Sequence, residues 1–184
     1  MNRLSEVFDG WNGYQSSLVT AIAPLTRDQL IWRPAQNLRS TGELARHISL
    51  GRVTWFARMD APGSRELIKR IEYWETDRDG NRDVIEDRVL ISEDASGLVE
   101  WLELTWQMIG ETLATWQTSD LPQTYDHVWK GKTYTVSRQW TLWRILTHDI
   151  HHGGELSLML GLQGISAFEL TDLFGHTILP PLAQ

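Results

Sequence analysis

The chain has 184 residues, of which 41% are hydrophobic and 22% are charged, and its net charge at pH 7 is −7. This length is sufficient for one domain with a substantial core. The acidic balance argues against a nucleic-acid partner, because binding to a phosphate backbone requires a basic face. We find no apolar run long enough to span a bilayer and no signal-like N-terminal segment, so we expect a cytoplasmic protein without a membrane partner.

The chain contains no cysteine. Disulfides, thiolate metal sites and cysteine nucleophiles are therefore excluded, and any bound metal must take imidazole or carboxylate ligands. The ten tryptophans are an unusual number. Tryptophan buries a large apolar area and keeps one hydrogen-bond donor, so most of these residues are expected in the core or at an interface.

The first part of the chain predicts one long helix and one short one. Apolar residues recur at helical spacing over residues 4–22, and Pro24 ends the pattern. Thr26 and Gln29 are placed as a capping box, in which each side chain accepts a hydrogen bond from the other residue's backbone amide. This pair predicts a short helical turn, and residues 32–40 follow as a loop.

Two further long helices are predicted on either side of an irregular region. Ser40 and Glu43 form a second capping box, and the helix that they begin ends just before this region. Residues 62–92 show no sustained periodicity and are the part of the chain whose structure the sequence pattern defines least. Ser92 is expected to begin the next helix, whose apolar stripe continues to about Trp116.

The last part of the chain predicts a hairpin and a fourth long helix. Residues 124–137 alternate between polar and apolar side chains around a central Lys-Gly-Lys, which is typical of a short β-hairpin. Ser137 caps a helix that continues to about Gly161, and residues 166–180 predict a short final helix. Four long amphipathic segments with short connections predict an all-α four-helix bundle that forms a single domain over residues 1–184.

Three of the six histidines lie in the sequence LTHDIHHGGELSLML, residues 146–160, within the last long helix. His148 and His152 are four residues apart, so their side chains share one helix face, with Cβ atoms roughly 6 Å apart. Two imidazoles at this spacing are able to bind one metal ion. A polar helix face is the ordinary alternative, and a third ligand from another helix would favour the metal.

His47 is the candidate third ligand. Leu44 and Ile48 place it on the inward face of the second long helix. A lone inward histidine is more commonly hydrogen-bonded to a carbonyl or a tyrosine hydroxyl. Three inward histidines on facing helices would be satisfied together by one divalent ion, so we predict a metal site formed by His47, His148 and His152.

Glu155 lies two turns after His148, on the same helix face. Three roles fit this position: a fourth ligand, a proton acceptor, or a hydrogen-bond partner that orients an imidazole. We expect Glu155 to be a catalytic base near the metal and not a tightly bound ligand. His151 is expected at the rim of the site, although it is also an alternative ligand.

Other residues in and near this helix are expected to have structural roles. Asp149 faces another direction and is expected in a surface or cross-helix ion pair. Gly153 and Gly154 each cost about 1 kcal/mol relative to alanine in a helix, which predicts close approach of another helix or a ligand to the backbone. His127 and His176 are interpreted as ordinary residues outside the site.

These motifs resemble the DinB-like family, also called the DinB/YfiT-like metalloenzymes. The family has an inward histidine on its second helix, which corresponds to His47 in ELARHI, and an HxxxHRGQ-like motif on its fourth. The second motif corresponds to His148 and His152 in HDIHHGGE, and LTRDQLIWRP is similar to the family's segment before the second helix. Two positions depart from the pattern, since Gly153 replaces the arginine and Glu155 replaces the glutamine. Relative to the family, residues 62–92 also look like an insertion between the second and third helices.

The resemblance implies a bundle of up-down-down-up type with a three-histidine divalent metal site. Characterised relatives include transferases and isomerases that use a low-molecular-weight thiol such as mycothiol, bacillithiol or glutathione. We accordingly expect a divalent ion, for which zinc, nickel and iron are all suitable with imidazole ligands. The expected enzyme is a transferase that uses such a thiol, or a hydrolase that uses metal-activated water on a small-molecule substrate. The alternative is a bundle that binds metal for storage, sensing or a stress response without turnover.

The resemblance also implies a homodimer, and the number of tryptophans favours the same conclusion. The first and third long helices are the candidate surface, with Trp11 and Trp101 as possible anchors.

Overall fold

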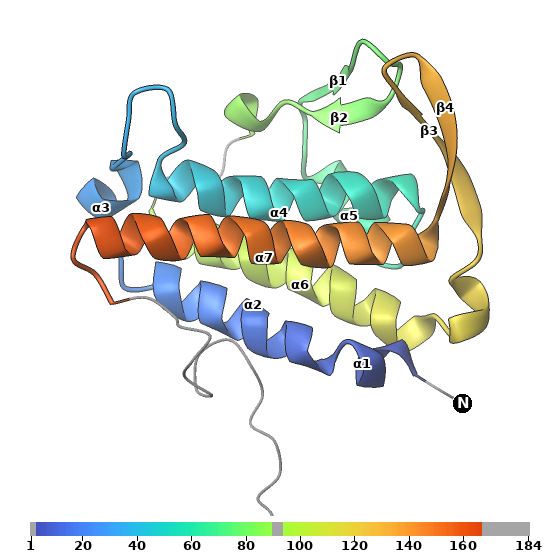
Figure 1. The fold of residues 1–184 in the computed structure, drawn as a ribbon, viewed down its shortest axis with the longest axis horizontal. Helices are drawn as coiled ribbons and strands as arrows, with labels where there is room; N and C mark the ends of the chain where they lie inside the picture. Colours follow the sequence, from blue (N-terminus) through green and yellow to red (C-terminus); the bar gives the residue numbers. More distant parts are fainter. Residues whose placement is uncertain (1–2, 90–93, 167–184) are drawn as a thin grey trace, which may run out of the picture.

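The computed structural model describes residues 3–89 and 94–166, most of which are helical. Four long helices lie side by side (Figure 1): α2 (Asp9–Ile22), α4 (Thr41–Arg58), α6 (Ala95–Thr115) and α7 (Arg138–Leu162). α2 and α7 run in one direction and α4 and α6 in the other, so the predicted up-down-down-up bundle is confirmed. The predicted final helix lies almost wholly outside the described residues. Within those residues, no helix is long and apolar enough to cross a membrane.

Both predicted capping boxes are present. The first begins α3 (Arg27–Ile31), where the Thr26 hydroxyl accepts a hydrogen bond from the Gln29 amide and the Gln29 side chain accepts one from the Thr26 amide. The second begins α4 with the same pair of hydrogen bonds between Ser40 and Glu43. These contacts satisfy amide groups that have no partner within the helix, and so fix where each helix starts.

The starts of α6 and α7 are also set by side chains. The Ser137 hydroxyl accepts a hydrogen bond from the Trp140 amide, which confirms the predicted start of α7. α6 begins after Asp94, whose carboxylate accepts a hydrogen bond from the Gly97 amide. Ser92, the predicted cap, lies outside the described residues. The predicted first helix is divided at its N-terminal end into α1 (Leu4–Val7) and α2.

The described part of this region, residues 62–89, forms small elements that pack beside α4. In chain order they are α5 (Ser64–Lys69), β1 (Trp74–Thr76), β2 (Arg82–Val84) and the 3-10 helix η1 (Glu86–Arg88). β1 and β2 pair antiparallel. This hairpin contacts the predicted second one, formed by β3 (Thr124–Trp129) and β4 (Lys132–Ser137). Asn81 donates to the Val128 carbonyl, and the Asp79 carboxylate accepts hydrogen bonds from the Lys130 and Gly131 amides.

A buried ion pair joins all four long helices. Arg52 of α4 and Asp149 of α7 are both 0% exposed, and the guanidinium Nε and Nη2 lie 3.0 and 2.8 Å from Asp149 Oδ2. Arg52 Nη1 also donates to Gln15 of α2 and to Thr105 of α6. Trp11 of α2 donates its indole N–H to the same Asp149 oxygen. Of the two interactions predicted for Asp149, the cross-helix ion pair is therefore present, and it is fully buried.

The environment of Trp11 corrects one prediction. Its side chain is only 2% exposed and packs edge-on against Trp106 within the same chain. A residue buried in its own core has no surface to offer to a second copy, so the prediction that Trp11 anchors a homodimer is wrong. Trp101 is partly buried against the core. The homodimer itself stays a prediction.

The two glycines of α7 have different surroundings. A Cβ on Gly153 would overlap the hydroxyl of Tyr14, which comes from α2 and donates to the Ile150 carbonyl. A Cβ on Gly154 would have no heavy atom within 4 Å. The predicted close approach is therefore present at Gly153, where the neighbouring element is α2.

We expect Arg52→Met to destabilise the protein strongly. The substitution keeps a flexible, unbranched side chain but leaves the buried carboxylate of Asp149 without its counter-charge, which costs about 3–5 kcal/mol. Chemical denaturation measures the free energy of unfolding. As a control, Arg65→Met removes an arginine from an exposed pair with Asp60 and should leave stability nearly unchanged. Similar losses in both variants would contradict the importance assigned to the buried pair.

Alanine substitutions at the two glycines are expected to have opposite effects. Gly154→Ala gains helix propensity in open space and should stabilise the protein by about 0.5–1 kcal/mol. Gly153→Ala must displace the buried ring of Tyr14, which outweighs this gain and should destabilise the protein by about 1–3 kcal/mol. Thermal and chemical denaturation of the two variants would test the contrast. Stabilisation by Gly153→Ala would show that Tyr14 moves freely.

Candidate metal centre

The three predicted histidines meet between α4 and α7. His47 comes from α4, whereas His148 and His152 come from successive turns of α7. The Nε2 atoms of His47 and His148 lie 3.2 Å apart, and the three ring centroids are 4.9, 4.6 and 4.4 Å from one another. The side chains of His47, His148 and His152 are 18, 17 and 12% exposed. One potential ligand nitrogen from each lies within 4.8 Å of the others, so the structure brings the predicted residues together.

The close approach of the two helices depends on Gly51 of α4. A Cβ at this position would lie 2.8 Å from Cε1 of His148 and 3.1 Å from its Nε2. The imidazole of His148 therefore packs directly against the backbone of α4. Any larger residue at position 51 would push His148 away from His47. Sequence reasoning did not identify this role for Gly51.

Two of the imidazoles direct Nδ1 toward a carboxylate. Nδ1 of His47 lies 2.6 Å from Glu86 Oε1, and Nδ1 of His152 lies 2.7 Å from Glu155 Oε2. Carboxylate partners of this kind orient a metal-binding histidine and fix which nitrogen carries the proton. Glu86 was not predicted as part of the site. It belongs to η1, in the region without periodicity, where no local sequence signal indicates a contact with α4.

The third imidazole also faces a carboxylate, at a longer distance. Nδ1 of His148 lies 3.8 Å from Asp149 Oδ1. Both atoms are buried, and neither has a hydrogen-bond partner among the described residues. Burial raises the pKa of Asp149, but the charge of Arg52 and the hydrogen bonds to Asp149 hold the pKa below its usual value. Asp149 is thus ionised, and it favours a proton on Nδ1 of His148.

The donor atoms fit a divalent ion. A proton on each Nδ1, facing a carboxylate, leaves a lone pair on Nε2 of the same ring, and the Nε2 atoms of His47 and His148 face each other. Two lone pairs that face each other at 3.2 Å repel unless a proton or a cation lies between them. Two nitrogens bound to one tetrahedral zinc, each at ~2.0–2.1 Å, lie about 3.3 Å apart. The observed spacing is therefore suited to a metal shared by these imidazoles.

The charges around the centre also favour a cation. Burial lowers the pKa of His152 to about 4, against the hydrogen bond that His152 donates to the carboxylate of Glu155, which raises it. This imidazole is therefore neutral near pH 7, as metal binding requires. Burial raises the pKa of Glu86, but its hydrogen bond to His47 and the nearby charge of Arg39 keep the pKa below its usual value. The centre thus contains a neutral imidazole, His152, and an ionised carboxylate, Glu86, which faces the imidazole of His47.

A second group of side chains lies beside the first. His151, His152 and Glu155 are also close enough to hold a metal. However, the side chains of His151 and Glu155 are 68 and 47% exposed. In addition, Nδ1 of His152 faces Glu155 as a hydrogen-bond partner. The more buried group with His47 is the better-built site. His151 lies at the rim, with Nε2 3.4 Å from Glu155 Oε1. Of the three roles considered for Glu155, its contact with His152 matches that of an orienting partner.

Comparisons with known proteins agree with this arrangement of helices. Residues 14–156 match the family model described as the DinB superfamily. Among solved structures, a DinB-like protein from Bacillus cereus has a TM-score of 0.65 at 15% identity, covering 89% of this chain and 94% of that one. A DinB-like protein from Bacillus subtilis has a TM-score of 0.59 at 15% identity, covering 90 and 96%. A conserved protein from Enterococcus faecalis has a TM-score of 0.64 at 14% identity, covering 86 and 96%.

At these identities the similarity to the solved structures concerns the fold. None of the curated proteins matches the chain. The family model nevertheless extends from α2 into the histidine motif of α7 and so includes His47, His148 and His152. The chain therefore belongs to the DinB superfamily.

Proposed function

We propose that this protein is a metal-dependent enzyme in which His47, His148 and His152 hold one divalent ion. The observation that carries the proposal is the convergence of three imidazoles, each of which directs Nδ1 toward a carboxylate. Structural zinc sites usually have four protein ligands, whereas three neutral ligands leave a position for substrate. This pattern favours a catalytic centre that acts on a small molecule.

The chain's own residues would position the ion and move a proton. When bound, a divalent ion supplies Lewis acidity, which activates a nucleophile or polarises a carbonyl at the remaining position. Glu86 and Glu155 hold the rings of His47 and His152 in place. Glu155 is half exposed at the rim, where its carboxylate is available to accept a proton from the nucleophile.

The chemistry of the chain limits the nucleophile. Because the protein has no cysteine, a sulfur nucleophile must come from a low-molecular-weight thiol used as cosubstrate. Water is the other nucleophile that this centre accommodates, and it would make the reaction a hydrolysis. Zinc, nickel and iron all suit three imidazoles. A homodimer, a cytoplasmic location and the absence of nucleic-acid and membrane partners stay predictions.

The second candidate function is metal binding without turnover, for storage or sensing. The observation that favours it is the proximity of Glu155 to His151 and His152, since Glu155 as a fourth ligand would close the site. The two candidates therefore differ in the role of Glu155.

The metal proposal predicts about one equivalent of bound zinc per chain. Tag-free protein is treated with a chelator, dialysed and titrated with zinc by calorimetry. His148→Ala should abolish stoichiometric binding, because it removes the imidazole whose Nε2 lies 3.2 Å from Nε2 of His47. His151→Ala is the matched control on the same helix and should bind zinc as the parent does. If the parent binds no zinc, or if His148→Ala binds it equally well, the three histidines are not a metal site.

Glutamine substitutions at the two carboxylates separate the candidate functions. Glu155→Gln and Glu86→Gln each weaken the orientation of one imidazole, so we expect about 10-fold to 100-fold weaker zinc affinity with the stoichiometry unchanged. Zinc titrations of both variants are compared. Loss of stoichiometric zinc in Glu155→Gln but not in Glu86→Gln would make Glu155 a ligand and favour storage or sensing.

Turnover is tested directly on the zinc-loaded protein. Glutathione, bacillithiol or mycothiol is incubated with an electrophilic acceptor, and loss of the free thiol is followed. We expect zinc-dependent consumption that His148→Ala abolishes and Glu155→Gln reduces. If neither thiol transfer nor hydrolysis occurs with intact zinc binding, the enzyme proposal fails and storage or sensing is favoured.

A further inference from the structure

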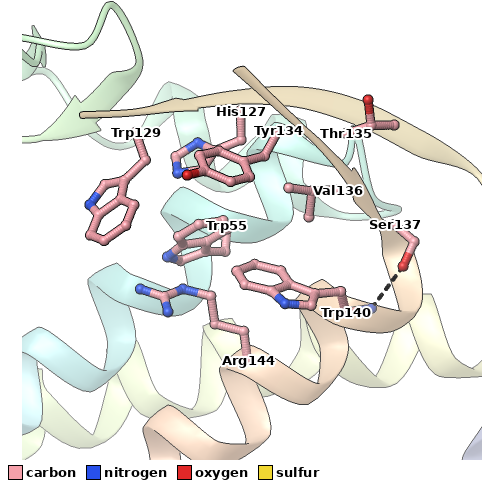
Figure 2. Close-up of a pocket in the computed structure, with 9 residues that line it drawn as sticks. All are labelled: Trp55, His127, Trp129, Tyr134, Thr135, Val136, Ser137, Trp140 and Arg144. Carbon is pink, nitrogen blue, oxygen red and sulfur yellow. Dashed lines mark hydrogen bonds between the residues drawn. The ribbon is translucent and has the colours of Figure 1, made fainter. Parts of the chain in front are cut away.

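A hollow of about 620 Å³ lies between α4, α7 and the β3–β4 hairpin (Figure 2). Its walls are mainly aromatic. Trp55 comes from α4, Trp140 from α7, and Trp129 and Tyr134 from the hairpin, with the guanidinium of Arg144 beside Trp55. The volume is in the range of small-molecule sites, and convergent aromatic walls around a charged group are typical of them.

The hollow lies next to the metal centre along α4 and α7. Trp140, Arg144 and His148 follow one another at four-residue intervals on one face of α7. On α4, Trp55 lies four residues after Gly51, the residue against which His148 packs. One helical turn advances about 5.4 Å along the axis. A molecule in the hollow would therefore lie one turn from the candidate metal ligands.

The hollow is positively charged although the chain is acidic. The guanidinium carbons of Arg144 and Arg58 lie 4.4 and 4.5 Å from the centroid of the Trp55 ring. Arg58 has Asp83 as a partner at 3.7 Å. Arg144 forms no ion pair with any residue of the described ranges and instead lies over the tryptophan rings.

The pKa of His127, in the wall of the hollow, is affected by these arginines. Its ring packs 5.0 Å from that of Trp55. Burial lowers the pKa of His127, and the charges of Arg58 and Arg144 lower it further, whereas the nearby carboxylates of Asp77 and Asp79 have the opposite, smaller effect. The imidazole is therefore neutral near pH 7. It does not compensate the charge of Arg144, which remains available to an anionic ligand.

We propose that this hollow binds the substrate of the metal centre, and that the substrate is a flat aromatic molecule with a carboxylate. The aromatic ring packs against Trp55 and Trp140, while the carboxylate pairs with the planar guanidinium of Arg144. Tryptophan-lined sites elsewhere bind cations. Here two guanidinium groups already contact Trp55 and would repel a further cation. The assignment of this molecule as substrate rests on the proposed function, whereas its binding does not require the metal.

Binding is measured by calorimetry on metal-free protein, with indole-3-acetate as the probe. We expect a dissociation constant of roughly 0.1–1 mM, given the size of this probe. Indole-3-acetamide retains the ring without the charge, hexanoate retains the charge without the ring, and tryptamine reverses the charge. Each should bind at least about tenfold more weakly than indole-3-acetate.

Matched variants assign the binding to the hollow. Arg144→Gln should weaken indole-3-acetate binding about tenfold or more and leave indole-3-acetamide unaffected. Arg138→Gln is its control, because Arg138 also lies over a tryptophan, Trp116, at the start of the same helix. Trp140→Ala should weaken both indole probes, whereas Trp143→Ala, at an exposed position on another face of α7, should not. Melting temperatures show which variants are folded. If Trp140→Ala does not fold, the comparison of Arg144→Gln with Arg138→Gln tests the proposal.

The proposal is overturned if the parent does not bind indole-3-acetate, if tryptamine or hexanoate binds better, or if Arg144→Gln and Arg138→Gln behave alike. Zinc titrations of the same preparations separate this result from the metal proposal. If the parent binds zinc but not indole-3-acetate, only the proposed substrate site is refuted. If it binds indole-3-acetate but not zinc, only the proposed metal centre is refuted. With Co²⁺ in place of zinc, the NMR signals of the bound indole should broaden. Unbroadened signals would show that the probe lies away from the centre.

Discussion

The buried ion pair between Arg52 and Asp149 determines how the helices of this bundle fit together. Its hydrogen bonds extend from α4 and α7 to Gln15 of α2 and Thr105 of α6, so each long helix contributes to one polar network in the core. A buried pair of this kind is often no more stabilising than apolar residues of the same size, but an arrangement that separates its partners is strongly unfavourable. We infer that the pair selects one rotation and one axial position for α7 relative to α4. Since Asp149 directly follows His148, this selection also directs His148 toward His47.

Through Asp149, the same buried network lies next to the histidines of the candidate metal centre. Arg52 and Trp11 both donate to Oδ2 of Asp149, which leaves Oδ1 facing His148. Glu86 provides the corresponding carboxylate for His47 from outside the bundle, on a segment held against α4. Three carboxylates from two elements, Glu86 of η1 and both Asp149 and Glu155 of α7, thus favour a proton on Nδ1 of each imidazole. The tautomers that leave Nε2 free for a metal follow from the fold and not from the histidine motif alone.

The features that could be predicted from the sequence are those with local signals. Capping boxes join residues three apart, helices have a 3.6-residue period, and His148 and His152 share a face because they are four residues apart. The convergence of these two histidines with His47 could be predicted because His47 lies on the inward face of a second helix. Glu86 could not be found in this way, because its contact with His47 joins an aperiodic segment to a distant helix. The burial of Trp11 depends on an acceptor 138 residues away, which its own neighbours in the sequence do not reveal. Gly153 replaces the arginine of the family motif where Tyr14 occupies the space beside the backbone.

The candidate metal centre and the hollow beside it are built partly from different parts of the fold. The candidate ligands lie on two long helices, whose relative position is fixed by the buried ion pair and by the contact at Gly51. One turn away, the wall of the hollow comes partly from the β3–β4 hairpin, which is attached to the first hairpin through Asp79 and Asn81. Loop and hairpin residues tolerate substitution better than residues of a packed core. The hairpin residues Trp129 and Tyr134 are therefore free to change without disturbing the candidate ligands, whereas Trp55, Trp140 and Arg144 lie on the same two helices as these ligands and are constrained with them.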